Sequence, residues 1–249
     1  VQDTVFLARR QEDAQSDFFA RLQLAARTHG GSKPIVRDLN RAVNYRALIT
    51  GVHVMAGKLR STFAANENTV GVLLPNAVAH VVVLFALFRL GKTPAIMNFS
   101  TGLRNVLDSA DTAGIKTVLT SRAFVEKANL GELVGQLATT NQVVFLEDLA
   151  KTISLLDKLN GLYRYFRRQP GAATADSRLI LFTSGTEGRP KGVVLSHQAI
   201  LANIDQASSV IDYSPADRML NALPMFHSFG LMAGTMLPIL GGIEFFFFP

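Results

Sequence analysis

The chain of 249 residues contains no cysteine, which excludes disulfide bonds and any chemistry that needs a thiolate of its own. Only 18% of its residues are charged, whereas 48% are hydrophobic. That balance excludes a disordered tail and provides enough apolar side chains for a substantial core. Its most apolar run, 81–88, is far shorter than the ~20 residues of a membrane-spanning helix. A core helix over 77–90 is therefore predicted, and any reactive thiol must come from a partner.

The two ends of the sequence lack the features of a complete protein. The N-terminus, Val1-Gln-Asp-Thr, has neither a starting methionine nor the basic and apolar segments of a secretory signal. At the other end, residues 243–249 include four consecutive phenylalanines. Such a strand-forming run favours aggregation unless it is paired or covered. We therefore expect the chain to be a fragment of a longer polypeptide.

Short apolar runs alternate with segments of helical period along the chain. Runs that are apolar on both faces are typical of buried parallel strands, and the segments between them are typical of covering helices. The alternation predicts an α/β fold with mostly parallel sheets covered by helices. The predicted strands are 34–37, 42–44, 69–74, 94–97, 116–120, 143–146, 178–183, 193–196 and 243–249, and the predicted helices are 16–28, 48–59, 77–90, 103–113 and 151–160.

The pattern loosens between residues 146 and 178. Residues 169–176 have the composition of a linker. We therefore expect a first subdomain over 1–172 and the start of a second over 173–249. For residues 151–168, where apolar residues alternate with Lys and Arg, a solvated surface helix is the favoured interpretation, and peripheral contact with a membrane surface is the alternative.

The formal net charge of +6 suits an anionic partner. A nucleotide, an acidic carrier protein and a phospholipid surface all meet that description. Nucleic acid is not expected, because the basic residues are scattered and no nucleic-acid module is present. The local basic cluster at Arg164, Arg167 and Arg168 is too small to change that conclusion.

Residues 183–192, Thr-Ser-Gly-Thr-Glu-Gly-Arg-Pro-Lys-Gly, concentrate groups that bind phosphate. Glycines let backbone amides approach an anion, hydroxyls add donors, and Lys191 supplies a positive charge. A Walker A loop would need a hydroxyl residue where Gly192 stands. A glycine-rich hairpin without a ligand is the alternative, but it explains neither the hydroxyls nor the lysine. The stretch therefore predicts a loop that holds the triphosphate of a nucleotide.

The stretch resembles the phosphate loop of the adenylate-forming enzymes, the superfamily of acyl-CoA synthetases, luciferases and nonribosomal-peptide adenylation domains. All ten positions fit the family pattern. Glu187, together with 195–198 and 222–230, is similar to the acyl–acyl-carrier-protein synthetase branch. That branch forms part of a bifunctional synthetase and 2-acylglycerophosphoethanolamine acyltransferase of bacterial membranes. The resemblance implies an incomplete large N-terminal domain of an adenylate-forming enzyme.

The resemblance also implies the ligands and the site. ATP and Mg²⁺ are the implied cofactors, a fatty acid is the implied substrate, and an acyl carrier protein or coenzyme A is the implied thiol donor. Lys191 and His227 have the catalytic positions, although a histidine packed in the core is the alternative for His227. Glu187 would repel phosphate and is expected to point outward or to hold the loop. The implied nucleotide-binding residues are Thr183, Ser184, Gly185, Thr186, Glu187, Gly188 and Lys191, and the implied substrate-binding residues are Phe226, His227, Phe229 and Gly230.

Several parts of the family lie outside this sequence. They are the adenine- and metal-binding segment, the ribose-binding aspartate, the hinge and the mobile small domain with its lysine. We therefore expect the isolated chain not to turn over. A lysophospholipid would be a partner only through an acyltransferase domain outside the sequence, and the resemblance implies a location on the cytoplasmic side of the bacterial inner membrane. A noncatalytic nucleotide- or membrane-binding module is the rival function, while a serine hydrolase is disfavoured because no Gly-x-Ser-x-Gly elbow occurs.

Overall fold

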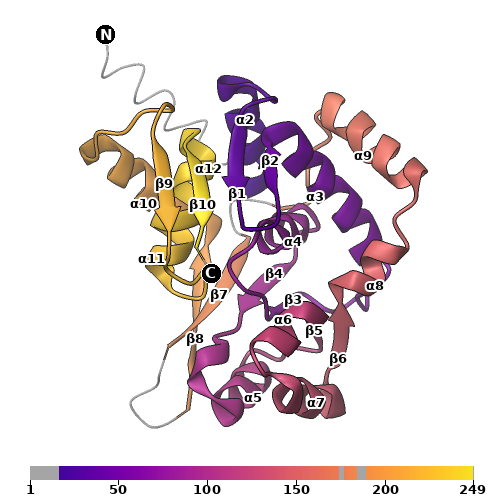
Figure 1. The fold of residues 1–249 in the computed structure, drawn as a ribbon. Helices are drawn as coiled ribbons and strands as arrows, with labels where there is room; N and C mark the ends of the chain where they lie inside the picture. Colours follow the sequence, from indigo (N-terminus) through magenta and orange to yellow (C-terminus); the bar gives the residue numbers. More distant parts are fainter. Residues whose placement is uncertain (1–16, 174–176, 184–188, 249) are drawn as a thin grey trace.

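The computed structural model describes residues 17–173, 177–183 and 189–248, and their strands form two sheets (Figure 1). The six-stranded sheet has the order β6-β5-β3-β4-β7-β8, and the four-stranded sheet has the order β2-β1-β10-β9. The strands are β1 (Pro34–Arg37), β2 (Ala42–Asn44), β3 (Thr69–Val72), β4 (Thr93–Ile96), β5 (Thr117–Thr120), β6 (Gln142–Phe145), β7 (Arg178–Thr183), β8 (Lys191–Ser196), β9 (Arg218–Asn221) and β10 (Glu244–Phe247).

Within each sheet one strand pair is antiparallel, β1 with β2 and β7 with β8, and the other pairs are parallel. The predicted α/β class with mostly parallel sheets is confirmed. The α-helices are α2 (Phe18–His29), α3 (Tyr45–Leu59), α4 (Val78–Arg89), α5 (Leu103–Thr112), α6 (Arg122–Lys127), α7 (Gly131–Thr140), α8 (Leu146–Lys151), α9 (Leu155–Phe166), α10 (His197–Val210), α11 (Ser228–Leu231) and α12 (Leu237–Gly241), with a 3₁₀ turn η1 (Phe99–Thr101) and a π-helical turn η2 (Met232–Met236).

The inner strands of the six-stranded sheet, β5, β3, β4 and β7, are buried on both faces, which explains their apolar runs, whereas the edge strand β8 is largely exposed. Along β7, Leu179 and Leu181 join the core formed with α2, α3 and α4, whereas Ile180 and Phe182 join the core formed with α5, α6 and α7. The alternation follows from side chains that point to opposite faces at successive strand positions. Helices thus cover the sheet on each side, as Figure 1 shows.

Helix α4 is the most apolar helix and lies in the core, as predicted for 77–90. Ten of its twelve residues are buried, so its apolar character matches its surroundings on every side. Among the described residues no helix is both long and apolar enough to cross a bilayer.

The phenylalanine-rich run forms β10, which lies between β1 and β9 in the four-stranded sheet. Phe245 and Phe247 are fully buried, while Phe248 beyond the strand is exposed. Both edges of β10 pair in parallel, so the run that the sequence marks as prone to aggregation is covered.

Helix α9 differs from the prediction of a helix over 151–160. Helix α8 ends at Lys151, and α9 begins at Leu155 and continues to Phe166. A capping box sets this start, because the Ser154 hydroxyl accepts from the amide of Asp157 and the Asp157 carboxylate accepts from the amide of Ser154. The division at residue 172 stays a prediction; each sheet contains strands from both sides of it.

Candidate functional site

The motif 183–192 connects β7 with β8, and its two ends lie directly opposite each other. The strands pair without interruption from Arg178 with Ser196 to Thr183 with Lys191. The second strand therefore begins two residues earlier than predicted, and Lys191 belongs to it. Both Thr183 and Lys191 are exposed. Five predicted site residues, Ser184, Gly185, Thr186, Glu187 and Gly188, lie outside the described residues.

The end of β7 lies at the carboxyl edge of the six-stranded sheet. Strand β7 is parallel to β4, with Ile180 opposite Ala95 and Leu181 opposite Ile96. Thr183 is therefore level with Asn98, two residues beyond β4. Ligands of open α/β sheets bind outside the carboxyl ends of the strands, so the motif opens at the edge where a nucleotide would bind.

The second predicted segment, 222–230, reaches the same edge through the side chain of Asn76. That side chain follows β3; its amide donates to the carbonyl of Leu223 at 2.9 Å, and its oxygen accepts from the amide of Met225 at 3.0 Å. The ring of Phe226 packs edge-on against Phe99, with 5.1 Å between centroids. Since Phe99 directly follows Asn98, the end of β4 lies between the two motifs.

Gly230 is held where the segment turns into η2. Its carbonyl accepts from the Thr235 hydroxyl at 2.9 Å and from the Asn221 amide at 3.2 Å. Thr235 also accepts from Asn221 at 3.1 Å, so the buried polar groups satisfy one another. A π-helical turn follows at once, a feature frequent at functional sites. The network fixes the backbone that carries His227.

Gly230→Ala is expected to destabilise the protein by about 1–3 kcal/mol. A methyl group at Gly230 would collide with the carbonyl of Pro224 and would lie 2.7 Å from that of Leu223, and backbone cannot rotate away as a side chain can. Urea unfolding should show the loss, whereas Gly135→Ala, on α7 with open space around it, should cause none. Equal stability of the two variants would contradict the tight packing of this segment.

The three predicted side chains of the segment have different surroundings. Phe226 is buried in the core, whereas His227 and Phe229 are exposed. The alternative of a core-packed histidine at 227 is therefore wrong; Phe226 occupies the core and the imidazole lies against its ring, 4.8 Å between centroids. His227 and Phe229 are thus accessible to a substrate at this edge.

The described residues offer no metal site made by the chain itself. Within 17–173, 177–183 and 189–248, no three His, Asp or Glu side chains come together as a metal would require. The expected Mg²⁺ therefore finds no ligand set of the protein in this part of the chain.

The structure places the two ends of the glycine-rich motif opposite each other and packs residues 223–226 of the second segment against Asn76 and Phe99, beyond β3 and β4. The assignment of these residues to one site stays a prediction. The structure adds Asn76 and Asn221, which hold that segment and were not predicted. Asn76 could have been recognised from the sequence, because it is a polar residue that follows a buried strand and ligands of α/β sheets bind outside the carboxyl ends of the strands. The sequence gives no comparable signal for the partners of Asn221.

The fold and this edge define the class: an α/β domain of the adenylate-forming type, with a glycine-rich hairpin at the carboxyl edge of its larger sheet. The chain belongs to the AMP-binding enzyme family, whose model matches residues 22–249. The acyl–acyl-carrier-protein synthetase branch is a finer assignment than this match supports.

Individual relatives agree with the family. The probable 4-coumarate–CoA ligase 3 of Dictyostelium discoideum is 25% identical over 199 residues, 73% of this chain and 36% of that protein. Sulfoacetate–CoA ligase of Cupriavidus necator is 28% identical over 210 residues, 82% of this chain and 39% of that protein. The N-terminal domain of FACL13 from Mycobacterium tuberculosis has a TM-score of 0.76 at 20% identity, covering 94% of this chain and 57% of that one. The chain spans about two fifths of the length of these curated relatives.

Proposed function

We propose that the chain is the N-terminal part of an ATP-dependent acid–thiol ligase, which activates a carboxylic acid as an acyl-adenylate and transfers the acyl group to a thiol. One observation carries the proposal. Thr183 and Lys191, the first and ninth residues of the phosphate-loop pattern, face each other in register at the carboxyl edge. Membership of the AMP-binding enzyme family supports it.

The first step joins two anions. A carboxylate oxygen attacks the α-phosphorus of ATP, a new P–O bond forms, and the bond to pyrophosphate breaks. Since both reactants are negatively charged, the site must offset phosphate charge and align the carboxylate. Lys191 places one positive charge at the start of β8 for the β- and γ-phosphates. His227 and Phe229 lie across the edge, where the acid would be positioned.

The second step needs a thiol that this chain lacks. The thiol sulfur attacks the acyl carbon, a thioester forms, and AMP leaves with the bonding electrons of the acyl–oxygen bond. We propose a phosphopantetheine thiol of an acyl carrier protein as the acceptor and a fatty acid as the substrate, on the cytoplasmic side of a bacterial membrane. Glu187 and the segments 195–198 and 222–230 support that branch over coenzyme A; the rival is a coenzyme A ligase like the named relatives.

The acceptor can be tested with the complete protein, a radiolabelled fatty acid and ATP. Acyl carrier protein with its phosphopantetheine arm is expected to become acylated at least tenfold faster than coenzyme A at equal concentration, a ratio that differential binding of about 1.4 kcal/mol supplies. Carrier protein without the arm is the matched control and should stay unlabelled. Faster labelling of coenzyme A would contradict the carrier-protein assignment, and no acyl-adenylate with any carboxylic acid would contradict the ligase itself.

A further inference from the structure

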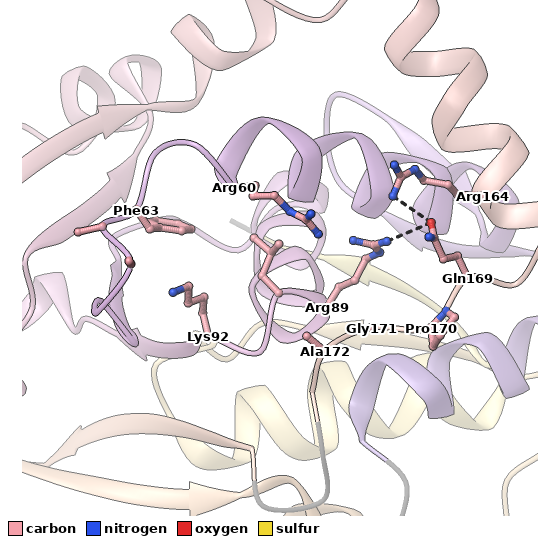
Figure 2. A pocket seen from close by; sticks show the side chains of 12 residues that line it. Arg60, Phe63, Arg89, Lys92, Arg164, Gln169, Pro170, Gly171 and Ala172 are labelled. Carbon is pink, nitrogen blue, oxygen red and sulfur yellow. Dashed lines mark hydrogen bonds between the residues drawn. The ribbon is translucent and has the colours of Figure 1, made fainter.

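A second candidate site lies at the opposite edge of the six-stranded sheet. A cavity of about 640 Å³ is lined by four basic residues, Arg60, Arg89, Lys92 and Arg164. Lys92 directly precedes β4, and Arg89 ends α4. The cavity therefore lies at the amino ends of the strands, whereas the glycine-rich motif lies at their carboxyl ends. We call it the Arg89 cavity (Figure 2).

Arg89 is the buried member of the set. It is only 5% exposed, and its Nε has no hydrogen-bond partner. One of its terminal nitrogens is 3.5 Å from Oε1 of Gln169, and a terminal nitrogen of Arg164 donates to the same oxygen at 2.9 Å. Figure 2 shows Arg60 beside this pair, with Lys92 and Phe63 farther along the cavity. Two guanidinium groups thus share one neutral acceptor.

Among the described residues, no carboxylate pairs with the positive charges of the cavity. In the part of the chain that the structure describes, no carboxylate lies within 4 Å of the side-chain nitrogens of Arg60, Arg89, Lys92 or Arg164. Burial lowers the pKa of Arg89, and the charges of Arg164 and Arg60 lower it further. Like charges gathered without a counter-ion destabilise a fold, so the arrangement calls for an anion.

The segment 171–172 packs directly against the backbone of Arg89. The amide of Ala172 donates to the carbonyl of Arg89 at 2.8 Å. A Cβ on Gly171 would lie 3.1 Å from the Cα of Arg89, so this approach leaves no room for a larger residue. These contacts hold the backbone of Arg89 in place, so its unpartnered Nε lines a preformed cavity.

We propose that the Arg89 cavity binds the phosphate group of an organic phosphate, separately from the nucleotide site. Guanidinium groups match phosphate through paired, charge-assisted hydrogen bonds. The volume lies within the usual range for small-molecule sites, well above what a phosphate ion needs. Phe63, Leu90 and Pro170 also line it, so the remainder of the ligand has apolar surface to contact.

The phosphate can come from a soluble metabolite or from a lipid headgroup. Helix α9, which supplies Arg164, gives the reason to test the lipid. Its exposed side carries a stripe of large apolar side chains opposite the buried Gly161, which suits contact with a bilayer surface. The exposed residues of the stripe are Leu155, Leu156, Leu159, Tyr163 and Phe166.

The test measures binding of glycerol 3-phosphate by calorimetry, and binding to phosphatidylcholine vesicles with or without phosphatidic acid by flotation. Arg164→Gln is expected to weaken binding at least tenfold, as loss of a charge-assisted contact does. Arg167→Gln, three residues farther along the chain and outside the cavity lining, is the matched control and should bind as the unchanged chain. Lys191→Ala should also leave this binding unchanged.

Arg89→Met removes the buried charge while keeping a flexible apolar side chain. It should abolish binding without lowering the melting temperature, because the charge it removes is unbalanced. If glycerol 3-phosphate binds and Arg164→Gln weakens that binding, the ligand is a soluble phosphate. If only vesicles with phosphatidic acid bind and Arg164→Gln weakens that binding, the ligand is a lipid headgroup. Absence of both, or equal losses in Arg164→Gln and Arg167→Gln, would overturn the proposal.

Discussion

Replacing Lys191 by alanine in the complete protein is expected to lower carboxylate-dependent ATP–pyrophosphate exchange by about 10²–10³-fold, the usual effect of removing one preorganised group that stabilises developing charge. Lys191 is exposed at the start of β8 and directly opposite Thr183. Its charge therefore faces the end of the hairpin where the triphosphate is proposed to bind, and no other residue of the described hairpin strands β7 and β8 at this end is basic.

Arg189→Ala is the matched control for Lys191→Ala. Arg189 is also an exposed cation of the motif, but it stands at the variable position of the family pattern. Its replacement is therefore expected to lower ATP–pyrophosphate exchange by less than tenfold. Because both side chains are exposed, both variants should keep the melting temperature of the unchanged protein. Equal exchange by Lys191→Ala and the unchanged protein would show that this lysine does not act on the phosphates.

Acidification is expected to unfold the chain through three buried histidines, His53, His80 and His197. Burial lowers the pKa of His80 from 6.5 to about 4, although a hydrogen bond to the carbonyl of Pro75 opposes the shift. Burial lowers the pKa of His53 and of His197 to about 3, with the charge of Arg89 adding to the effect on His53. Each ring is therefore neutral in the folded chain at pH 5, where an unfolded chain would protonate it.

The direction of the pH effect follows from these shifts. A group whose pKa falls on folding contributes its full stability above pH 6.5 and loses it as the pH falls toward 3–4. For His80 alone the loss is about 3 kcal/mol, a large share of the ~5–15 kcal/mol of a typical domain. The free energy of unfolding from urea titrations should drop steeply between pH 6.5 and 4. A constant value across that interval would contradict neutral buried histidines.

His53→Leu separates titration from packing. Neither ring nitrogen of His53 has a hydrogen-bond partner among the described residues, so leucine removes the proton-binding group without leaving a partner unsatisfied. The variant should match or exceed the stability of the unchanged chain at pH 7 and unfold at a lower pH. If its acid midpoint stayed the same, protonation of His53 would not contribute to acid unfolding.

Nine of the ten strands could be predicted because apolar pattern and strand burial carry the same information, whereas β9 and the helices α6, α7, α10, α11 and α12 were not predicted. The runs at 69–74, 94–97 and 116–120 are apolar on both faces because helices cover both faces of their sheet, and each became a strand within two residues of its predicted ends. The start of α9 shifted because one capping box outweighs several residues of helical period. The pairing of β10 with β1, across two hundred residues, leaves no local trace in the sequence.

The sequence predicted only those residues of the candidate site that lie close together along the chain. Residues 183–192 are contiguous, so their hydroxyls, glycines and lysine could be recognised together. Asn76 and Asn221 act on the loop of His227 from distant elements, and such contacts arise only once the sheets are formed. The Arg89 cavity has the same character, because residues 60–65 after α3, the end of α4, α9 and the segment 169–172 contribute to it separately.

A crystal structure of the complete protein with a non-hydrolysable ATP analogue tests the central claim most directly. The account predicts the β- and γ-phosphates between the ends of the β7–β8 hairpin, with the ammonium group of Lys191 within ~3 Å of a phosphate oxygen. A triphosphate bound elsewhere, for example among Arg60, Arg89 and Arg164, would contradict it.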